Sequence, residues 1–208
     1  GWYELSLTLE SLRAIRQKLA VPFDVMASMC TPGVLRWARA ADASEQQVAD
    51  LHRRVTEGWR MELPWEDVTG HPLTGAYRPP FEHQRVMASV SCTLDGTAYL
   101  CGMGTGKTRS ALESVRYLKT SGRLANVLWV CPKGVMGTAE REMKMWTPGQ
   151  RSMRLVEMPV KERERLLKTL TADSGVTAII NYDVLYLLQD TIVELAKRSR
   201  LGVVFDEC

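Results

Sequence analysis

The sequence feature that most constrains this chain is a glycine-rich loop, Cys101-Gly102-Met103-Gly104-Thr105-Gly106-Lys107-Thr108. A short apolar run at residues 97–100 precedes the loop, and residues 111–118 after it carry apolar side chains at three- and four-residue steps. A strand, a glycine loop, Gly-Lys-Thr and a helix form the context that a phosphate-binding loop requires. Backbone N–H groups of such a loop turn toward an anion, and the N-terminus of the helix adds the positive end of its dipole.

The loop residues have expected roles in binding ATP and Mg²⁺. Lys107 is expected to reach the β- and γ-phosphates, and the Thr108 hydroxyl to ligate Mg²⁺. The strict pattern has glycine where this chain has Cys101, which leaves a flexible loop before an ordinary helix as the alternative. The flanking strand and helix favour a nucleotide site. Its backbone cradle comprises Gly102, Met103, Gly104, Thr105 and Gly106.

The composition is that of an ordinary soluble globular protein, with 45% hydrophobic and 25% charged residues. Its 208 residues allow one domain, or one domain and a smaller second one. We expect no membrane span, because the sequence has no apolar run of about 18 residues. The five cysteines lie far apart without paired-ligand spacing. We therefore expect a reducing compartment, the cytoplasm, or the nucleus in a eukaryote.

The charge is distributed unevenly. Residues 1–76 contain 8 Lys/Arg and 10 Asp/Glu, whereas residues 77–208 contain 19 and 14, so the excess positive charge accompanies the glycine loop. A polyanionic partner would suit this asymmetry, although surplus lysine on a solvated face is common.

The chain is expected to hold two domains. Residues 1–76 read as a small, mostly helical accessory domain and linker, with a helix that begins at Ser44 and ends before Gly58. From residue 77, strands expected at 97–100, 126–131, 153–158, 176–180 and 201–205 alternate with helices, the last of which spans 183–199. This alternation predicts an α/β fold with a doubly wound parallel sheet, whose ligands gather at the carboxyl ends of the strands.

An acidic pair, Asp206-Glu207, directly follows the last apolar strand. Asp206 is expected to hold Mg²⁺ opposite the Thr108 hydroxyl, and Glu207 to orient and polarise the water that attacks the γ-phosphate. Two ordinary acids at a strand end are the alternative. The phosphate loop on the same parallel sheet favours the functional interpretation.

These motifs together resemble the first RecA-like lobe of superfamily-2 helicases, and most closely that of the Swi/Snf-type translocases of double-stranded DNA. The segment from Met103 to Thr108 is similar to the family's Met-Gly-Leu-Gly-Lys-Thr motif I, which also lacks the first glycine. Val130-Cys131-Pro132 resembles motif Ia, and Tyr182-Asp183 resembles motif Ib. Asp206-Glu207-Cys208 resembles the start of motif II, Asp-Glu-x-His, so we expect a fragment cut at that motif.

The resemblance covers about residues 77–208, and it implies a RecA-like, P-loop NTPase fold and several roles. Gln84, in Pro80-Phe81-Glu82-His83-Gln84, would recognise adenine. Lys133, Thr138 and Asn181 would touch phosphates of a nucleic acid. Lys107, Asp206 and Glu207 would be catalytic in a DNA-dependent ATPase that moves along duplex DNA. A second RecA-like lobe would supply the arginine finger, so we expect this fragment alone to be inactive.

Other classes of function remain open from sequence. An RNA helicase or a restriction-type translocase would share the lobe and differ in nucleic acid. A small nucleotide kinase or another phosphate-loop protein would need no basic track, and a pure binding module would hold ATP or DNA without turnover.

Overall fold

The computed structural model describes residues 32–63, 79–172 and 174–207. The chain divides into two compact units, residues 1–59 and 60–208, and each is described by itself. The expected domain boundary at residues 76–77 lies outside the described residues. Within the described ranges, every helix is too short or too polar to cross a membrane.

The first unit contains a long helix, α3 (Pro32–Thr56). The predicted start at Ser44 was wrong, because the helix continues twelve residues further toward the N-terminus. Proline suits a first helical position, where its missing N–H costs no hydrogen bond, and residues 34–43 are rich in Ala and Arg. The predicted end was confirmed: Gly58 adopts φ 91° directly after the helix, a left-handed conformation that glycine accepts readily.

The second unit is built on a four-stranded, all-parallel sheet with the strand order β2-β3-β1-β4. Its strands are β1 (Asn126–Cys131), β2 (Arg151–Arg154), β3 (Val176–Asn181) and β4 (Leu201–Phe205). The central strands β1 and β3 are buried at every position, as expected of a parallel sheet covered on both faces. The predicted α/β fold with a parallel sheet is therefore confirmed.

Two of the predicted elements have different bounds. The strand expected at 153–158 lies at 151–154, because Glu157 adopts φ 56° and Pro159 then opens the next helix. The single helix expected at 183–199 is three short ones, since Leu188, buried in the core, leaves the α region with φ −108° and ψ 8°. These pieces are α8 (Tyr182–Leu185), η2 (Tyr186–Leu188) and α9 (Gln189–Arg198).

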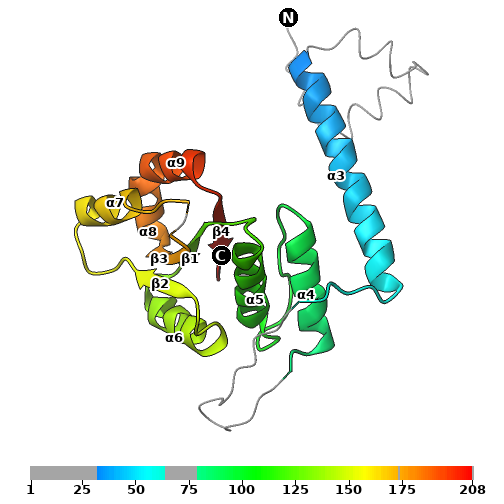
Figure 1. The fold of residues 1–208 in the computed structure, drawn as a ribbon, viewed down its shortest axis with the longest axis horizontal. Coiled ribbons are helices and arrows are strands. Elements are labelled where there is room, and N and C mark those ends of the chain that lie inside the picture. Colours follow the sequence, from blue (N-terminus) through cyan, green and yellow to red (C-terminus); the bar gives the residue numbers. More distant parts are fainter. Residues whose placement is uncertain (1–31, 64–78, 173, 208) are drawn as a thin grey trace, which may run out of the picture. The chain divides into compact units, whose positions relative to one another are not determined.

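The remaining helices lie around the sheet. They are α4 (Glu82–Thr93), α5 (Lys107–Thr120), η1 (Lys133–Val135), α6 (Met136–Trp146) and α7 (Val160–Lys168), with α4 packed on α5. Figure 1 shows α6 below the strands and α7, α8 and α9 above them. Alternate residues of β1 divide accordingly: Leu128 and Val130 pack into the core shared with α7 and α9, and Trp129 and Cys131 pack toward α5 and α6.

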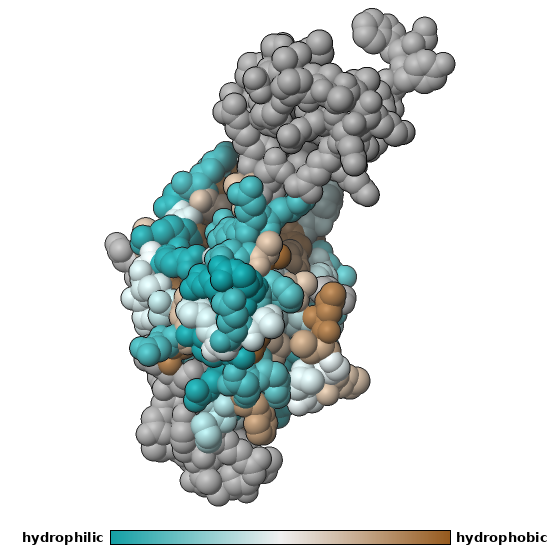
Figure 2. Space-filling view, turned by 90° about the vertical axis from the view of Figure 1, so that its right-hand side faces the viewer, coloured by the Kyte–Doolittle hydropathy of each residue, from teal (hydrophilic) through white to brown (hydrophobic). Residues whose placement is uncertain are grey.

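The strand expected at residues 97–100 does not form. This segment belongs to no helix and to no ladder among the described residues, and Leu100 is 96% exposed. Side chains tie the segment to α4 instead: the Tyr99 hydroxyl lies 2.7 Å from Ser91 Oγ and donates to Met87 O at 3.3 Å. Figure 2 shows one face of the molecule, where hydrophilic side chains dominate and apolar ones gather in small, separate groups.

A buried amide joins the start of β1 to the start of β3, and it yields a test of the fold. Asn126 is fully buried; its Nδ2 donates to Thr171 O at 2.7 Å, and its Oδ1 accepts from Val176 N at 3.1 Å. We expect Asn126→Ala to lower the free energy of unfolding by about 2–4 kcal/mol, because two buried backbone groups lose their partner. Urea unfolding followed by circular dichroism would measure the change. Gln189→Ala, a change at an exposed residue of α9, should alter the free energy of unfolding by no more than about 0.5 kcal/mol. An equal effect of both variants would contradict the structural role of Asn126.

Candidate active site

The glycine loop ends in a left-handed turn that opens α5. Gly104 has φ 74°, and Gly106, the N-cap residue of α5, has φ 79° and ψ 31°. A Cβ atom on Gly106 would overlap the side-chain amide of Gln84, so this position excludes side chains by both backbone conformation and space. The predicted loop followed by a helix is therefore present, with the first backbone N–H groups of α5 at its end.

Gln84, on α4, is hydrogen-bonded to the loop through its side chain. Its Oε1 accepts from Phe81 N at 3.0 Å, and its Nε2 donates to Thr105 O at 3.2 Å. His83 Nε2 lies 2.9 Å from the same carbonyl oxygen. Gln84 is 5% exposed, and both ends of its amide are engaged within the chain. The contact makes it a positioning residue for the loop, whereas its role with adenine stays a prediction. The sequence pattern did not single out His83.

Lys107 lies inside the loop that precedes it. Its Nζ donates to Cys101 O at 3.0 Å and to Gly102 O at 2.9 Å. Met103, at the tip of the loop, is 99% exposed. The ammonium group is thus held by the backbone of its own loop, where a phosphate group would meet it together with the N-terminus of α5.

Thr108 and Asp206 are brought to one place through Glu142, a residue that the sequence analysis missed. Burial raises the pKa of Glu142, the Asp206 carboxylate raises it further, and Arg141 and a hydrogen bond with the Thr108 side chain oppose these effects. The three side chains come from α5, α6 and the end of β4. Only the helical register of α6 could have indicated Glu142, because the sequence places it far from both motifs.

The backbone and side chain of Asp206 are fixed by three hydrogen bonds. Trp129 Nε1 donates to Asp206 Oδ2 at 3.2 Å, Asp206 N donates to Val130 O at 2.8 Å, and Tyr182 OH donates to Asp206 O at 3.0 Å. Trp129 is fully buried, so its indole N–H presents a fixed donor. Glu207 is exposed and adopts φ 53°, a costly backbone conformation for glutamate that redirects the chain at the sheet edge.

Cys131 lies beside the acidic pair, and its thiol is expected to be unreactive. Burial raises the pKa of its thiol to about 11, and the carboxylates of Asp206 and Glu207 add to the rise. A thiol with this pKa stays protonated near neutral pH, so it is a poor nucleophile and metal ligand. No group of three or more His, Cys, Asp or Glu side chains suited to a metal ion occurs within the described ranges.

Arg109, which follows the loop, is directed toward α6. Its guanidinium carbon lies 4.4 Å from the centre of the Trp146 ring, and the residue is 7% exposed. A buried cation over an indole face is a stable arrangement. Arg109 therefore serves the contact between α5 and α6 rather than the mouth of the loop.

Two of the three predicted nucleic-acid contacts lie together. Lys133 and Asn181 line one hollow at the carboxyl ends of β1 and β3, where Cys131 pairs with Asn181 in the strand register. Thr138 does not line this hollow. It is exposed on α6, and its Oγ1 accepts from Arg141 Nη2 at 3.0 Å.

The side chains near the loop suit a hard cation. The Thr108 hydroxyl, the Asp206 carboxylate and the neighbouring Glu142 carboxylate are all oxygen donors, the ligand type that Mg²⁺ prefers. Thr108 and Asp206 would hold the ion, as the sequence analysis predicts.

Comparisons with known proteins found similarity only among solved structures. No family model matches the chain, and no curated protein matches it. Among solved structures, the SWI2/SNF2 ATPase core of Sulfolobus solfataricus in complex with double-stranded DNA is similar, with a TM-score of 0.46 and 17% identity over 72% of this chain and 34% of that one. This chain thus spans about a third of the length of that structure.

The fold and the site define a class of protein. The chain is an α/β protein with helices on both faces of a parallel sheet. A glycine loop opens α5, and an acidic residue held by Trp129 ends β4.

The Trp129–Asp206 hydrogen bond yields a test of this site. We expect Trp129→Phe to weaken ATP binding in the presence of Mg²⁺ by about tenfold, since a hydrogen bond to a charged group contributes about 1.5–3 kcal/mol. ATP binding in EDTA should be unchanged, because the indole would act through Asp206 and the Mg²⁺ that Asp206 is predicted to hold. Isothermal titration calorimetry with and without Mg²⁺ measures both values.

Ile179→Val is the matched control, because Ile179 is fully buried in the same apolar cluster. We expect it to reduce stability slightly and to leave both affinities unchanged. Equal losses with and without Mg²⁺ for Trp129→Phe would show that the indole has only a packing role.

Proposed function

We propose that this chain is the ATP-binding lobe of a helicase-like, DNA-dependent ATPase that moves along duplex DNA. One observation carries the proposal: besides burial, the Asp206 carboxylate raises the pKa of Glu142 and the Thr108 side chain lowers it, so the ends of two separate motifs adjoin one side chain. A phosphate loop and a strand-end aspartate that share a metal are the parts that hold Mg-ATP in P-loop NTPases. The motif resemblance narrows this general chemistry to a RecA-like lobe.

Each residue would then act on a defined part of the nucleotide. The N–H groups after Gly104 and Gly106 and the Lys107 ammonium would bind the phosphate oxygens. Mg²⁺ bound by Thr108 and Asp206 would supply positive charge where the γ-phosphate gains negative charge. Glu207, exposed at the edge of the sheet, would orient the attacking water and accept its proton. Gln84 would keep the loop in place and recognise adenine.

The DNA-related part of the proposal rests on charge and position. Residues 77–208 hold the excess of Lys and Arg, and Lys133 and Asn181 line the same hollow at the carboxyl edge of the sheet. Contacts to phosphates would orient the lobe on the duplex without reading its sequence. In this proposal, a second RecA-like lobe closes over ATP, and residues 1–76 form an accessory domain.

Lys107→Ala tests the nucleotide site. We expect this change to weaken Mg-ATP binding at least tenfold, because a charge-assisted phosphate contact contributes about 1.5–3 kcal/mol. The fold should persist, since Lys107 Nζ bonds only to carbonyls of its own loop among the described residues. Calorimetry measures the affinity. Lys144→Ala, which removes the same charge from an exposed ion pair with Glu140, should have no effect. Equal ATP affinity for wild type and Lys107→Ala would refute the proposed site.

ATP turnover by the 208-residue chain alone should be very slow. Lys107, Thr108 and Asp206 cover one side of the γ-phosphate, and Arg109 is engaged with Trp146. An arginine finger on the opposite side typically contributes about 10³–10⁵ in rate. We therefore expect ATP to bind and to remain unhydrolysed over minutes, with or without duplex DNA, in a phosphate-release assay. DNA-stimulated turnover near ~1 s⁻¹, within the usual range for enzymes, would contradict the two-lobe mechanism.

A further inference from the structure

A hollow lies where two neighbouring strands send the chain to opposite faces of the sheet. After β1 the chain passes to α6 on one face, and after the adjacent β3 it passes to α8 and α9 on the other. In open α/β sheets, such a switch point leaves a crevice at the carboxyl ends of the strands, where ligands bind. The hollow at this point has a volume of about 380 Å³, within the range of roughly 300–1,000 Å³ for ligand clefts.

Two cations line this hollow without a partner. Within the described residues, neither Lys133 nor Arg163 forms a side-chain hydrogen bond or ion pair, and Arg163 Nε is buried from solvent as well. Two other cations on α7 are paired: Arg165 bonds to Glu162 at 2.6 Å, and Lys168 to Glu164 at 2.7 Å. A buried guanidinium nitrogen without an acceptor is costly. The Arg163 guanidinium therefore needs a hydrogen-bond acceptor that the side chains of its own helix do not provide.

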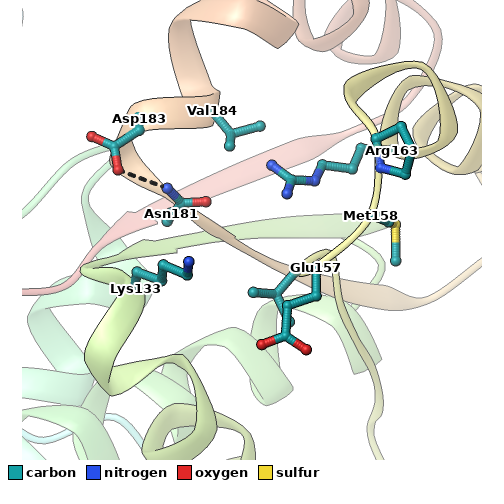
Figure 3. Close-up of a pocket in the computed structure, with 9 residues that line it drawn as sticks. Lys133, Glu157, Met158, Arg163, Asn181, Asp183 and Val184 are labelled. Atoms are coloured by element: carbon teal, nitrogen blue, oxygen red, sulfur yellow. Dashed lines mark hydrogen bonds between the residues drawn. The ribbon is translucent and has the colours of Figure 1, made fainter.

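The orientation of the side chains favours an anion. Figure 3 shows the Lys133 ammonium and the Arg163 guanidinium pointing toward the space beside Asn181, whereas the Glu157 carboxylate points away from it and the Asp183 carboxylate is hydrogen-bonded to the Asn181 amide. Asp183 accepts from Asn181 Nδ2 at 3.0 Å, which fixes the amide and leaves the second N–H of Nδ2 as a donor for an anion. The two carboxylates therefore lie at the edge of the hollow, and the Lys133 and Arg163 cations face its interior.

Apolar side chains make up the rest of the wall: Val156, Met158, Pro159 and Val184. An anion with an attached carbon skeleton suits a wall of this kind better than a bare ion does. A phosphodiester of a nucleic-acid strand combines both parts, because its sugar can lie against apolar atoms while its oxygens meet the cations.

We infer that the hollow binds one backbone phosphate of a nucleic-acid strand, and that Arg163 is a contact residue for it together with Lys133 and Asn181. The inference rests on the proposed function for the choice of a nucleic acid as ligand. It adds the segment from Val156 to Arg163 to the nucleic-acid track, a segment that none of the sequence motifs covers.

The test uses the 208-residue chain and two charge-matched variants on the same helix, Arg163→Gln and Arg165→Gln. Fluorescence anisotropy with a labelled 20-base-pair DNA duplex, measured over about 25–150 mM salt, gives the affinity and its salt dependence. We expect Arg163→Gln to weaken binding about tenfold at low salt and to reduce the slope of log K against log salt by about 1. Arg165→Gln, which removes an exposed and paired charge, should change affinity less than twofold. Lys133→Gln, a change at an exposed residue, should reproduce the effect of Arg163→Gln.

Other outcomes would overturn the inference. Equal effects of Arg163→Gln and Arg165→Gln would mean that only net charge matters. Phosphorus NMR with inorganic phosphate covers the remaining source of the anion: loss of phosphate binding in Arg163→Gln with unchanged DNA binding would assign the hollow to a small anion. Absence of DNA binding in a chain that still binds Mg-ATP through Lys107 would also overturn it, while leaving the proposed nucleotide site intact.

Discussion

The Asp206 carboxylate accepts a hydrogen bond from the Trp129 indole, and the arrangement of the site depends on this contact. Trp129 is fully buried on the central strand, so the donor has a fixed position relative to the sheet. Backbone and side-chain bonds from Val130 and Tyr182 hold the same residue at the end of β4. The aspartate thereby lies close enough to Glu142 to raise the pKa of that carboxyl group. Preorganised charge of this kind requires little rearrangement during a reaction.

Strand β1 separates two regions with different chemistry. Toward β4, its neighbour on one side, lie Asp206 and the elements that adjoin the glycine loop. Toward β3, its neighbour on the other side, lies the hollow with Lys133 and Arg163. Both regions lie at the carboxyl edge, because a parallel sheet directs every strand end the same way. A protein that couples nucleotide binding to nucleic-acid binding would need such neighbouring sites on one rigid strand.

The sequence predicted what depends on local pattern. The apolar runs of β1 and β3 were located to within one residue, and the loop and α5 follow from glycine and helix signals. It failed where long-range contacts decide. Tyr99 bonds to α4, and the short run around it forms no ladder among the described residues. Trp129 and Asp206 are 77 residues apart, so their contact has no local signature. Arg163 and Arg165 also look alike in the sequence of α7, and only the structure shows that one is paired and the other is not.

The central claim is that the glycine loop and Asp206 form a single Mg-ATP site. A double-mutant cycle of Thr108→Ala and Asp206→Asn, with Mg-ATP affinity measured by calorimetry, tests it most directly. Residues that share a partner show coupling of about 0.5–3 kcal/mol, whereas independent sites are additive to within about 0.3–0.5 kcal/mol. We expect the double variant to bind Mg-ATP about as weakly as the weaker single variant, because either change removes the shared metal. Fully additive losses would contradict the account.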